Sequence, residues 1–234
     1  CPITSPATSS PSAVRAAPLC AITLPRLLSS SHPMSGRALV AGPLYHTGPN
    51  TFCRYAMEGC AFLLLQTKFD AEQTLREIDA CAITNALMVP TMFVRLMKLP
   101  EAVRRSYDVR SLRNVVHSAA PCPSDVKRAI IDWWGPIIVE VYGSTEVGMP
   151  IMCTAGEWLD HPGTVGRPVD GTRIAIYDEA GAALPPGEVG EIFLHCDAYA
   201  DFVYHNRDAS LRDERDGMLS IGDMGCLKGG FLYL

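Results

Sequence analysis

The segment Tyr142-Gly-Ser-Thr-Glu146 combines residue types that suit a ligand carrying phosphate. Its glycine permits a tight turn, its two hydroxyls can hydrogen-bond phosphate oxygens, and its carboxylate can hold Mg²⁺. Its tyrosine offers an aromatic face on which a base can stack. The same spacing also fits a surface turn followed by a helix N-cap, so both interpretations stay open. The candidate ligand-binding residues are Tyr142, Gly143, Ser144, Thr145 and Glu146, the last also as metal ligand.

A second segment, Ser118-Ala-Ala-Pro121, follows the predicted strand 112–117, just as Tyr142 follows the predicted strand 137–141. Small residues at such a place let a flat ring approach the backbone closely. Because ligands of open α/β sheets gather at the carboxyl ends of strands, the two strand ends together predict a nucleotide site. The residues expected to line its adenine slot are Ala119, Ala120 and Pro121.

A third element is Ile221-Gly-Asp223. An aspartate after a glycine at a strand end suits a bidentate hydrogen bond to the two ribose hydroxyls of a nucleotide. An isolated aspartate of this kind equally fits a simple turn cap.

The elements that must position these residues follow an α/β pattern from residue 37 to about 156. Short apolar runs predict strands, and helical patterns separate them. Asp70 begins one helix with Gln73 as its capping-box partner. Ser124 caps another, which carries apolar residues at i, i+3, i+4 and i+7. Strands separated by helices predict a parallel sheet with helices on both faces. The predicted strands are 38–41, 61–65, 83–89, 112–117 and 137–141, and a further helix opens at Pro90.

The pattern changes after residue 156, where helical periodicity ends. The runs 173–177 and 191–195 predict strands, and the Gly- and Pro-rich segment 178–187 predicts the turn between them. We therefore expect a mostly parallel sheet with flanking helices, followed by an antiparallel partial β-barrel. The predicted units are an α/β nucleotide-binding subdomain at 37–156 and a β-rich subdomain at 157–234.

Residues 1–36 are rich in Ser, Pro and Ala and contain no acidic residue. This composition predicts a disordered or non-native leader, and a transit peptide is the alternative. Because the chain begins at Cys1 and ends on the apolar run 231–234, we expect it to be the central part of a longer protein.

Composition excludes several classes of function. The chain has 20 basic and 25 acidic residues and no basic run, which argues against nucleic-acid and anionic-membrane partners. No apolar stretch approaches the roughly 20 residues needed to span a bilayer. The nine cysteines lack zinc spacing and are scattered, which favours reduced thiols in a cytoplasm over a disulfide scaffold.

Four motifs, in this order, resemble those of the acyl-adenylate-forming (AMP-binding) superfamily, which includes acyl-CoA synthetases, luciferases and peptide-synthetase adenylation domains. Residues 117–123, 131–135 and 157–168 are most similar to the acyl-CoA synthetases of fatty acids and to the bile-acid CoA ligases. The resemblance covers residues 37–234, as the central part of the family's N-terminal domain. The four motifs are Pro43-Leu-Tyr-His46-Thr-Gly48, Val141-Tyr-Gly-Ser-Thr-Glu146, Gly187-Glu-Val-Gly-Glu191-Ile192 and Ile221-Gly-Asp223.

The resemblance implies an ATP-dependent ligase that converts a fatty or sterol-type carboxylic acid to acyl-AMP and transfers the acyl group to CoA. It implies ATP or AMP, Mg²⁺ and CoA as cofactor and co-substrates. Under it, Thr145 would hydrogen-bond phosphates, Glu146 would bind Mg²⁺, and Asp223 would bind the ribose. His46 would border the acyl or α-phosphate region, although taken alone it fits a packed or capping histidine.

Two family features have no counterpart in the sequence. These are the Lys-bearing phosphate loop before the His46 motif and the mobile C-terminal lid domain with its catalytic Lys. The sequence also departs from the family at Cys196, Met218 and Ile221. Because one lost charge contact costs roughly 10²–10³ in rate, we expect little ligase activity from the isolated chain. The alternatives are a non-catalytic remnant or AMP-binding module, another kind of adenylating enzyme, and a plain α/β scaffold that serves interactions.

Overall fold

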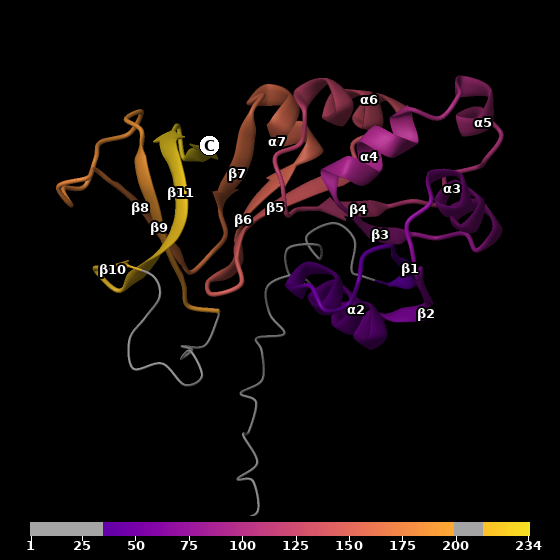
Figure 1. The fold of residues 1–234 in the computed structure, drawn as a ribbon, viewed down its shortest axis with the longest axis horizontal. Helices are drawn as coiled ribbons and strands as arrows, with labels where there is room; N and C mark the ends of the chain where they lie inside the picture. The colour runs from indigo at the N-terminus through magenta and orange to yellow at the C-terminus, as the bar shows by residue number, and fades with distance from the viewer. Residues whose placement is uncertain (1–34, 199–212) are drawn as a thin grey trace, which may run out of the picture.

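The structure, a computed structural model, describes residues 35–198 and 213–234, and its strands form one mixed sheet (Figure 1). The strand order is β2-β1-β3-β4-β5-β6-β7-β12-β11-β9-β8, with β10 beside β11. The first five strands of this order are parallel, as the sequence pattern predicts. They are β1 (Gly36–Val40), β2 (Cys60–Leu65), β3 (Asn85–Met88), β4 (Asn114–His117) and β5 (Ile138–Ser144).

Consecutive residues of the parallel strands point to opposite faces of the sheet, and the register aligns equivalent positions across four strands. Residues of the first row are at most 1% exposed, so this face is fully covered. That row is Leu39, Ala86, Val115 and Ile138, and the next row, on the other face, is Val40, Leu87, Val116 and Val139. Burial on both faces explains why apolar residues occupy successive positions within these strands.

Helices cover both faces of the parallel part (Figure 1). The face of the Leu39 row lies under α3 (Ala71–Ala80), α4 (Pro90–Met97), α6 (Ser124–Trp134) and α7 (Ala155–Asp160). The opposite face lies under α2 (Thr47–Gly59). The short α5 (Glu101–Arg105) follows α4 and has no buried residue.

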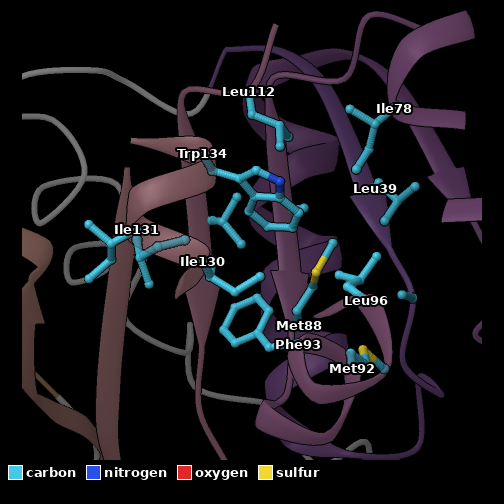
Figure 2. Packing of buried hydrophobic residues seen from close by; sticks show 14 of the residues in the cluster. Leu39, Ile78, Met88, Met92, Phe93, Leu96, Leu112, Ile130, Ile131 and Trp134 are labelled. Carbon is cyan, nitrogen blue, oxygen red and sulfur yellow. The ribbon is translucent and has the colours of Figure 1, made fainter. Parts of the chain in front are cut away.

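The larger core lies between the sheet and the first group of helices (Figure 2). Phe93 of α4 is fully buried and meets the Trp134 ring of α6 edge to face, with centroids 6.0 Å apart. Burying such a side chain stabilises the fold by about 1.5–3 kcal/mol, and the ring geometry adds about 0.5–1.5 kcal/mol. Trp134 is a core residue, and Trp133 packs partly buried against the same cluster.

The antiparallel part begins at β6 (Gly148–Thr154), which pairs with β5, and continues through β7 (Thr164–Pro168). The predicted hairpin around residues 178–187 is confirmed, since the strands on either side of it pair antiparallel over six positions. The remaining strands are β8 (Thr172–Tyr177), β9 (Gly190–Cys196), β10 (Glu214–Arg215), β11 (Met218–Lys228) and β12 (Phe231–Tyr233).

Three local expectations are wrong. The N-cap of α6 is Pro123 and not Ser124, which is the first helical residue. Asp70 caps α3 by accepting from the Gln73 amide at 2.9 Å, but the Gln73 side chain donates to Glu77, so the capping box is half formed. Helical structure also continues after residue 154, because α7 begins with a full capping box between Thr154 and Glu157.

Helix α2 was not expected from the sequence. Proline occupies its first turn, where the missing N–H costs nothing, and its moderate apolar stripe is Phe52, Cys53 and Ala56. In the part of the chain that the structure describes, no helix has the length and apolarity to cross a bilayer. The predicted leader at 1–36 lies outside the described residues apart from positions 35 and 36, and Gly36 already begins β1.

Candidate functional site

A pocket of about 250 Å³ lies where the carboxyl ends of β4 and β5 meet a bulge of β11. Its lining comes from segments spread over more than 100 positions of the sequence. Six of the residues predicted for nucleotide binding take part in this lining: Ala119, Ala120, Pro121, Tyr142, Gly143 and Asp223. Geometry therefore brings together the three segments that sequence reasoning treated separately.

The turn after β4 forms one wall of the pocket. Ala119 adopts a φ of +76°, a left-handed conformation that a non-glycine residue rarely takes. Because the side chains of Ala119 and Ala120 are small, a flat ring can lie against the backbone of this turn. Such strain persists only where surrounding structure imposes it, which fits a site shaped for a ligand.

Tyr142 and Asp223 also line the pocket and contact each other. The Tyr142 hydroxyl donates to Oδ2 of Asp223 at 2.8 Å, although the two residues are 81 positions apart. Burial, and after it this hydrogen bond to a carboxylate, raises the pKa of Tyr142 well above its usual range. The phenol therefore stays protonated at neutral pH and keeps its donor. Asp223 is exposed and stands where a ligand can reach its carboxylate.

Gly143 has a structural reason to be glycine. A Cβ atom at this position would lie 2.0 Å from the carbonyl oxygen of Gly148 and 2.8 Å from the Pro150 ring. The β5 and β6 backbones thus approach each other more closely than any side chain allows.

Ser144 ends β5, Thr145 and Glu146 lie in the turn before β6, and none of the three lines the pocket. The Ser144 hydroxyl accepts from the amides of Glu146 at 3.2 Å and Val147 at 3.4 Å, which shapes the turn. Thr145 is exposed. In sequence they come directly after Gly143, which lines the pocket.

His46 occupies the N-cap position of α2, where its side chain makes no capping hydrogen bond. Its ring lies 4.5 Å from the Tyr45 ring and is exposed. The next residue, Thr47, brings its hydroxyl within 3.5 Å of the Thr145 hydroxyl. The His46 segment therefore lies beside the Thr145 turn, but His46 does not line the pocket.

The described residues contain no group of three or more His, Cys, Asp or Glu side chains that could hold a metal ion. Glu146 therefore belongs to no such group among the described residues. Protein sites for Mg²⁺ commonly use one or two carboxylates, several waters and the phosphates of the substrate. The donor set fits an ion that arrives with a nucleotide, not one held by protein alone.

Sequence reasoning missed a buried charged group beneath the pocket. Lys127 of α6 forms an ion pair with Glu140, which also lines the pocket. His117 faces Glu140 from the neighbouring strand, and burial, together with the nearby Lys127, lowers the pKa of His117 to about 3. The sequence signal that could have predicted the buried ion pair is Glu140, a carboxylate among the apolar residues of 137–141.

Two cysteines also lie near this group. Burial raises the pKa of Cys122 to about 11 and that of Cys153 to about 12, so both thiols are inert at neutral pH.

The fold and this pocket agree with what comparison with known proteins shows. Residues 18–200 match the family of AMP-binding enzymes, which is more than half of the chain. The chain therefore belongs to this adenylate-forming family, in its acyl-CoA ligase type, and the resemblance seen in the motifs is confirmed.

Its relatives act on different acids. A medium/long-chain-fatty-acid–CoA ligase, FadD8 of Mycobacterium tuberculosis, is 32% identical over 205 residues, which are 86% of this chain and 35% of the relative. A feruloyl-CoA synthase of Amycolatopsis is 28% identical over 201 residues, 85% of this chain and 40% of the relative.

A solved structure shares the fold and was determined with nucleotide. The o-succinylbenzoate CoA synthetase of Bacillus subtilis, in complex with ATP and magnesium ion, matches with a TM-score of 0.69 and 25% identity. The match covers 85% of this chain and 41% of that one. The chain thus spans about a third to two fifths of the length of these proteins.

Proposed function

We propose that this chain forms the adenylate-binding part of an ATP-dependent acid–CoA ligase. The observation that carries the proposal is the convergence of Asp223, Tyr142 and the Ala119–Pro121 turn on one pocket. In the proposed complex, the base lies between Tyr142 and the small residues. Asp223 accepts hydrogen bonds from the ribose hydroxyls. The identity with relatives that are CoA ligases supports the same assignment.

The proposed reaction has two steps. A carboxylate oxygen of the acid attacks the α-phosphorus of ATP, and the bond to pyrophosphate breaks as the acyl-AMP bond forms. The sulfur of CoA then attacks the acyl carbon, and AMP leaves. No covalent enzyme intermediate is needed, so the chain's residues act by positioning and by electrostatic stabilisation.

Three residues at the edge of the pocket have proposed roles in the first step. The Thr145 hydroxyl donates to phosphate oxygens, and Glu146 would hold Mg²⁺. When bound, this ion neutralises charge that develops on the phosphates. His46, beside the Thr145 turn, borders the region where the acid approaches.

The acid is proposed to be a fatty or sterol-type acid, which the identity with the fatty-acid ligase supports. The feruloyl-CoA synthase among the relatives makes an aromatic acid the alternative. We also propose the cytoplasm as the compartment, because the cysteines within the described ranges, from Cys53 to Cys226, are all free thiols.

A thermal melt of the purified chain with AMP and Mg²⁺ tests the nucleotide pocket. A ligand at 100 times its Kd adds about 2.7 kcal/mol, so the midpoint should rise measurably. The Asp223→Ala variant should lose this rise. Asp132→Ala, which removes an exposed carboxylate on α6 outside the pocket lining, should keep it. If the wild-type midpoint does not respond to AMP, the proposed pocket is wrong.

A second candidate function is an AMP-binding module without catalysis, which the same pocket would serve. Carboxylate-dependent exchange of pyrophosphate into ATP distinguishes the two. We expect AMP binding with little exchange from this chain alone. Exchange at rates typical of complete ligases would contradict that expectation.

A further inference from the structure

The position of the Asp223 carboxylate depends on a bulge in β11. Ser220 pairs with Phe193 of β9 and Met224 pairs with Glu191, so three residues of β11 stand opposite Ile192 alone. Gly222, in the middle of this bulge, has a φ of +77°, a conformation that favours glycine. Asp223 comes directly after it, so the bulge determines where the carboxylate points.

A chain of hydrogen bonds holds this bulge. The Ser220 hydroxyl accepts from the Gly222 amide at 3.1 Å and donates to the Glu191 carboxylate on the neighbouring strand. Ser220 is buried, so a backbone N–H and a carboxylate would both lose a partner without its hydroxyl. A charged acceptor makes this pairing stronger than a neutral one. Neither Ser220 nor Glu191 lines the pocket.

A second contact holds the same carboxylate from the other side. The Tyr142 hydroxyl of β5 donates to Oδ2 of Asp223. The bulge of β11 and the end of β5 therefore fix Asp223 between them. Of these two supports, Tyr142 would itself touch the base, whereas the support from β9 acts only through the backbone.

We propose that Glu191 and Ser220 are positioning residues that hold the β11 bulge so that Asp223 meets the ribose hydroxyls. This inference rests on the proposed function, in which Asp223 accepts hydrogen bonds from ribose. It also assigns a role to the strand motif around Glu191, which the pocket itself does not use.

Two ligands that differ only in the ribose hydroxyls distinguish a positioning role of Ser220 and Glu191 from a general effect on stability. The probes are AMP and 2′,3′-dideoxyadenosine 5′-monophosphate, both with Mg²⁺, measured by calorimetric titration. For the wild-type chain, the Kd ratio of the dideoxy compound to AMP should be about 10–100, as expected for hydrogen bonds to a charged group. Asp223→Ala should bring this ratio to about 1, because the acceptor is gone.

Ser220→Ala should lower the ratio at least about fivefold while the dideoxy compound binds within about twofold of wild type. Ser220→Thr keeps the hydroxyl and should restore the ratio. Ser106→Ala, which removes a hydroxyl on the surface after α5, is the matched control and should change neither Kd.

A Ser220→Ala variant that weakens both ligands equally, or neither, overturns the positioning role. Where this variant fails to melt cooperatively, Glu191→Gln decides, because it keeps the shape and removes the charge. Its ratio should fall about threefold, and an unchanged ratio overturns the inference. If the proposed function itself is wrong, the wild-type chain should bind neither nucleotide, which distinguishes that failure from failure of the positioning role.

Discussion

The Nε2 atom of His117 lies 3.9 Å from Oε2 of Glu140, and the two residues face each other in register on β4 and β5. Among the described residues, neither ring nitrogen of His117 has a hydrogen-bond partner. Glu140 already has Lys127 as its cationic partner. The imidazole is thus a neutral group packed beside a complete ion pair, and this arrangement governs how the fold responds to acid.

Acid should destabilise the chain through His117. Because the pKa of His117 in the folded chain is about 3, below the usual 6.5 of a histidine, the unfolded chain binds the extra proton first. Stability is therefore lost as the pH falls below about 6.5, by up to about 1.4 kcal/mol per pH unit through this group. Urea unfolding of wild type and His117→Leu between pH 7.5 and 4.5 measures it. The free energy of unfolding of wild type should fall relative to that of His117→Leu toward low pH, and parallel curves would contradict the assignment.

Breaking the buried ion pair should cost far more than replacing it. Lys127→Met leaves the Glu140 carboxylate buried without its partner, which typically costs about 3–5 kcal/mol. The double variant Lys127→Met/Glu140→Met removes both charges and should recover most of that loss. Urea unfolding of the four proteins of this cycle gives the coupling energy. A double variant as unstable as Lys127→Met would show that the charge pairing is unimportant.

Two glycines should respond in opposite directions to the same substitution. Gly143→Ala forces a Cβ atom against the β6 backbone and should destabilise by about 1–3 kcal/mol or more, with loss of the response to AMP. Gly156, inside α7, has open space around its Cβ position. Gly156→Ala should therefore stabilise by about 0.5–1 kcal/mol. Thermal melts of both variants are the measurement, and similar midpoints would be evidence against the close approach at Gly143.

The ring and the hydroxyl of Tyr142 should make separable contributions to AMP binding. Stacking of a base on an aromatic ring contributes about 1–3 kcal/mol, so Tyr142→Ala should weaken AMP binding at least about fivefold. Tyr142→Phe keeps the ring and should change the Kd less than about fivefold, although Asp223 loses one donor. Titration calorimetry compares the three proteins. Equal losses in both variants would place the contribution in the hydroxyl and not in the ring.

The parallel part of the fold could be predicted because apolar strands with both faces buried are continuous apolar runs in sequence. Strands β3, β4 and β5 lie within or close to their predicted ranges for this reason. Helices α2 and α7 were missed because one starts with Thr, Gly and Pro and the other is too short for a periodic pattern. Local signals for a helix start also failed at Ser124, where the preceding proline takes the cap position.

The pocket lining was predictable where ligand-binding residues lie at strand ends, as at Ala119, Tyr142 and Asp223. Two groups were not. Lys127 and Glu140 are 13 positions apart on a helix and a strand, and only tertiary packing brings them together. Ser220 and Glu191 meet through strand pairing across a bulge, which no periodicity in the sequence reveals.

The contact between Tyr142 and Asp223 has a consequence for the shape of the sheet. Strands β6, β7 and β12 stand between β5 and β11, so a flat sheet would hold the two about 19 Å apart. A tyrosine and an aspartate cannot bridge that gap, so the intervening strands must curl round (Figure 1). Gly166 of β7 allows one close crossing, since a Cβ there would lie 2.0 Å from the Met152 carbonyl oxygen. The width of the pocket is therefore set by curvature, and a substitution at Gly166 would part its walls without altering any residue that lines it.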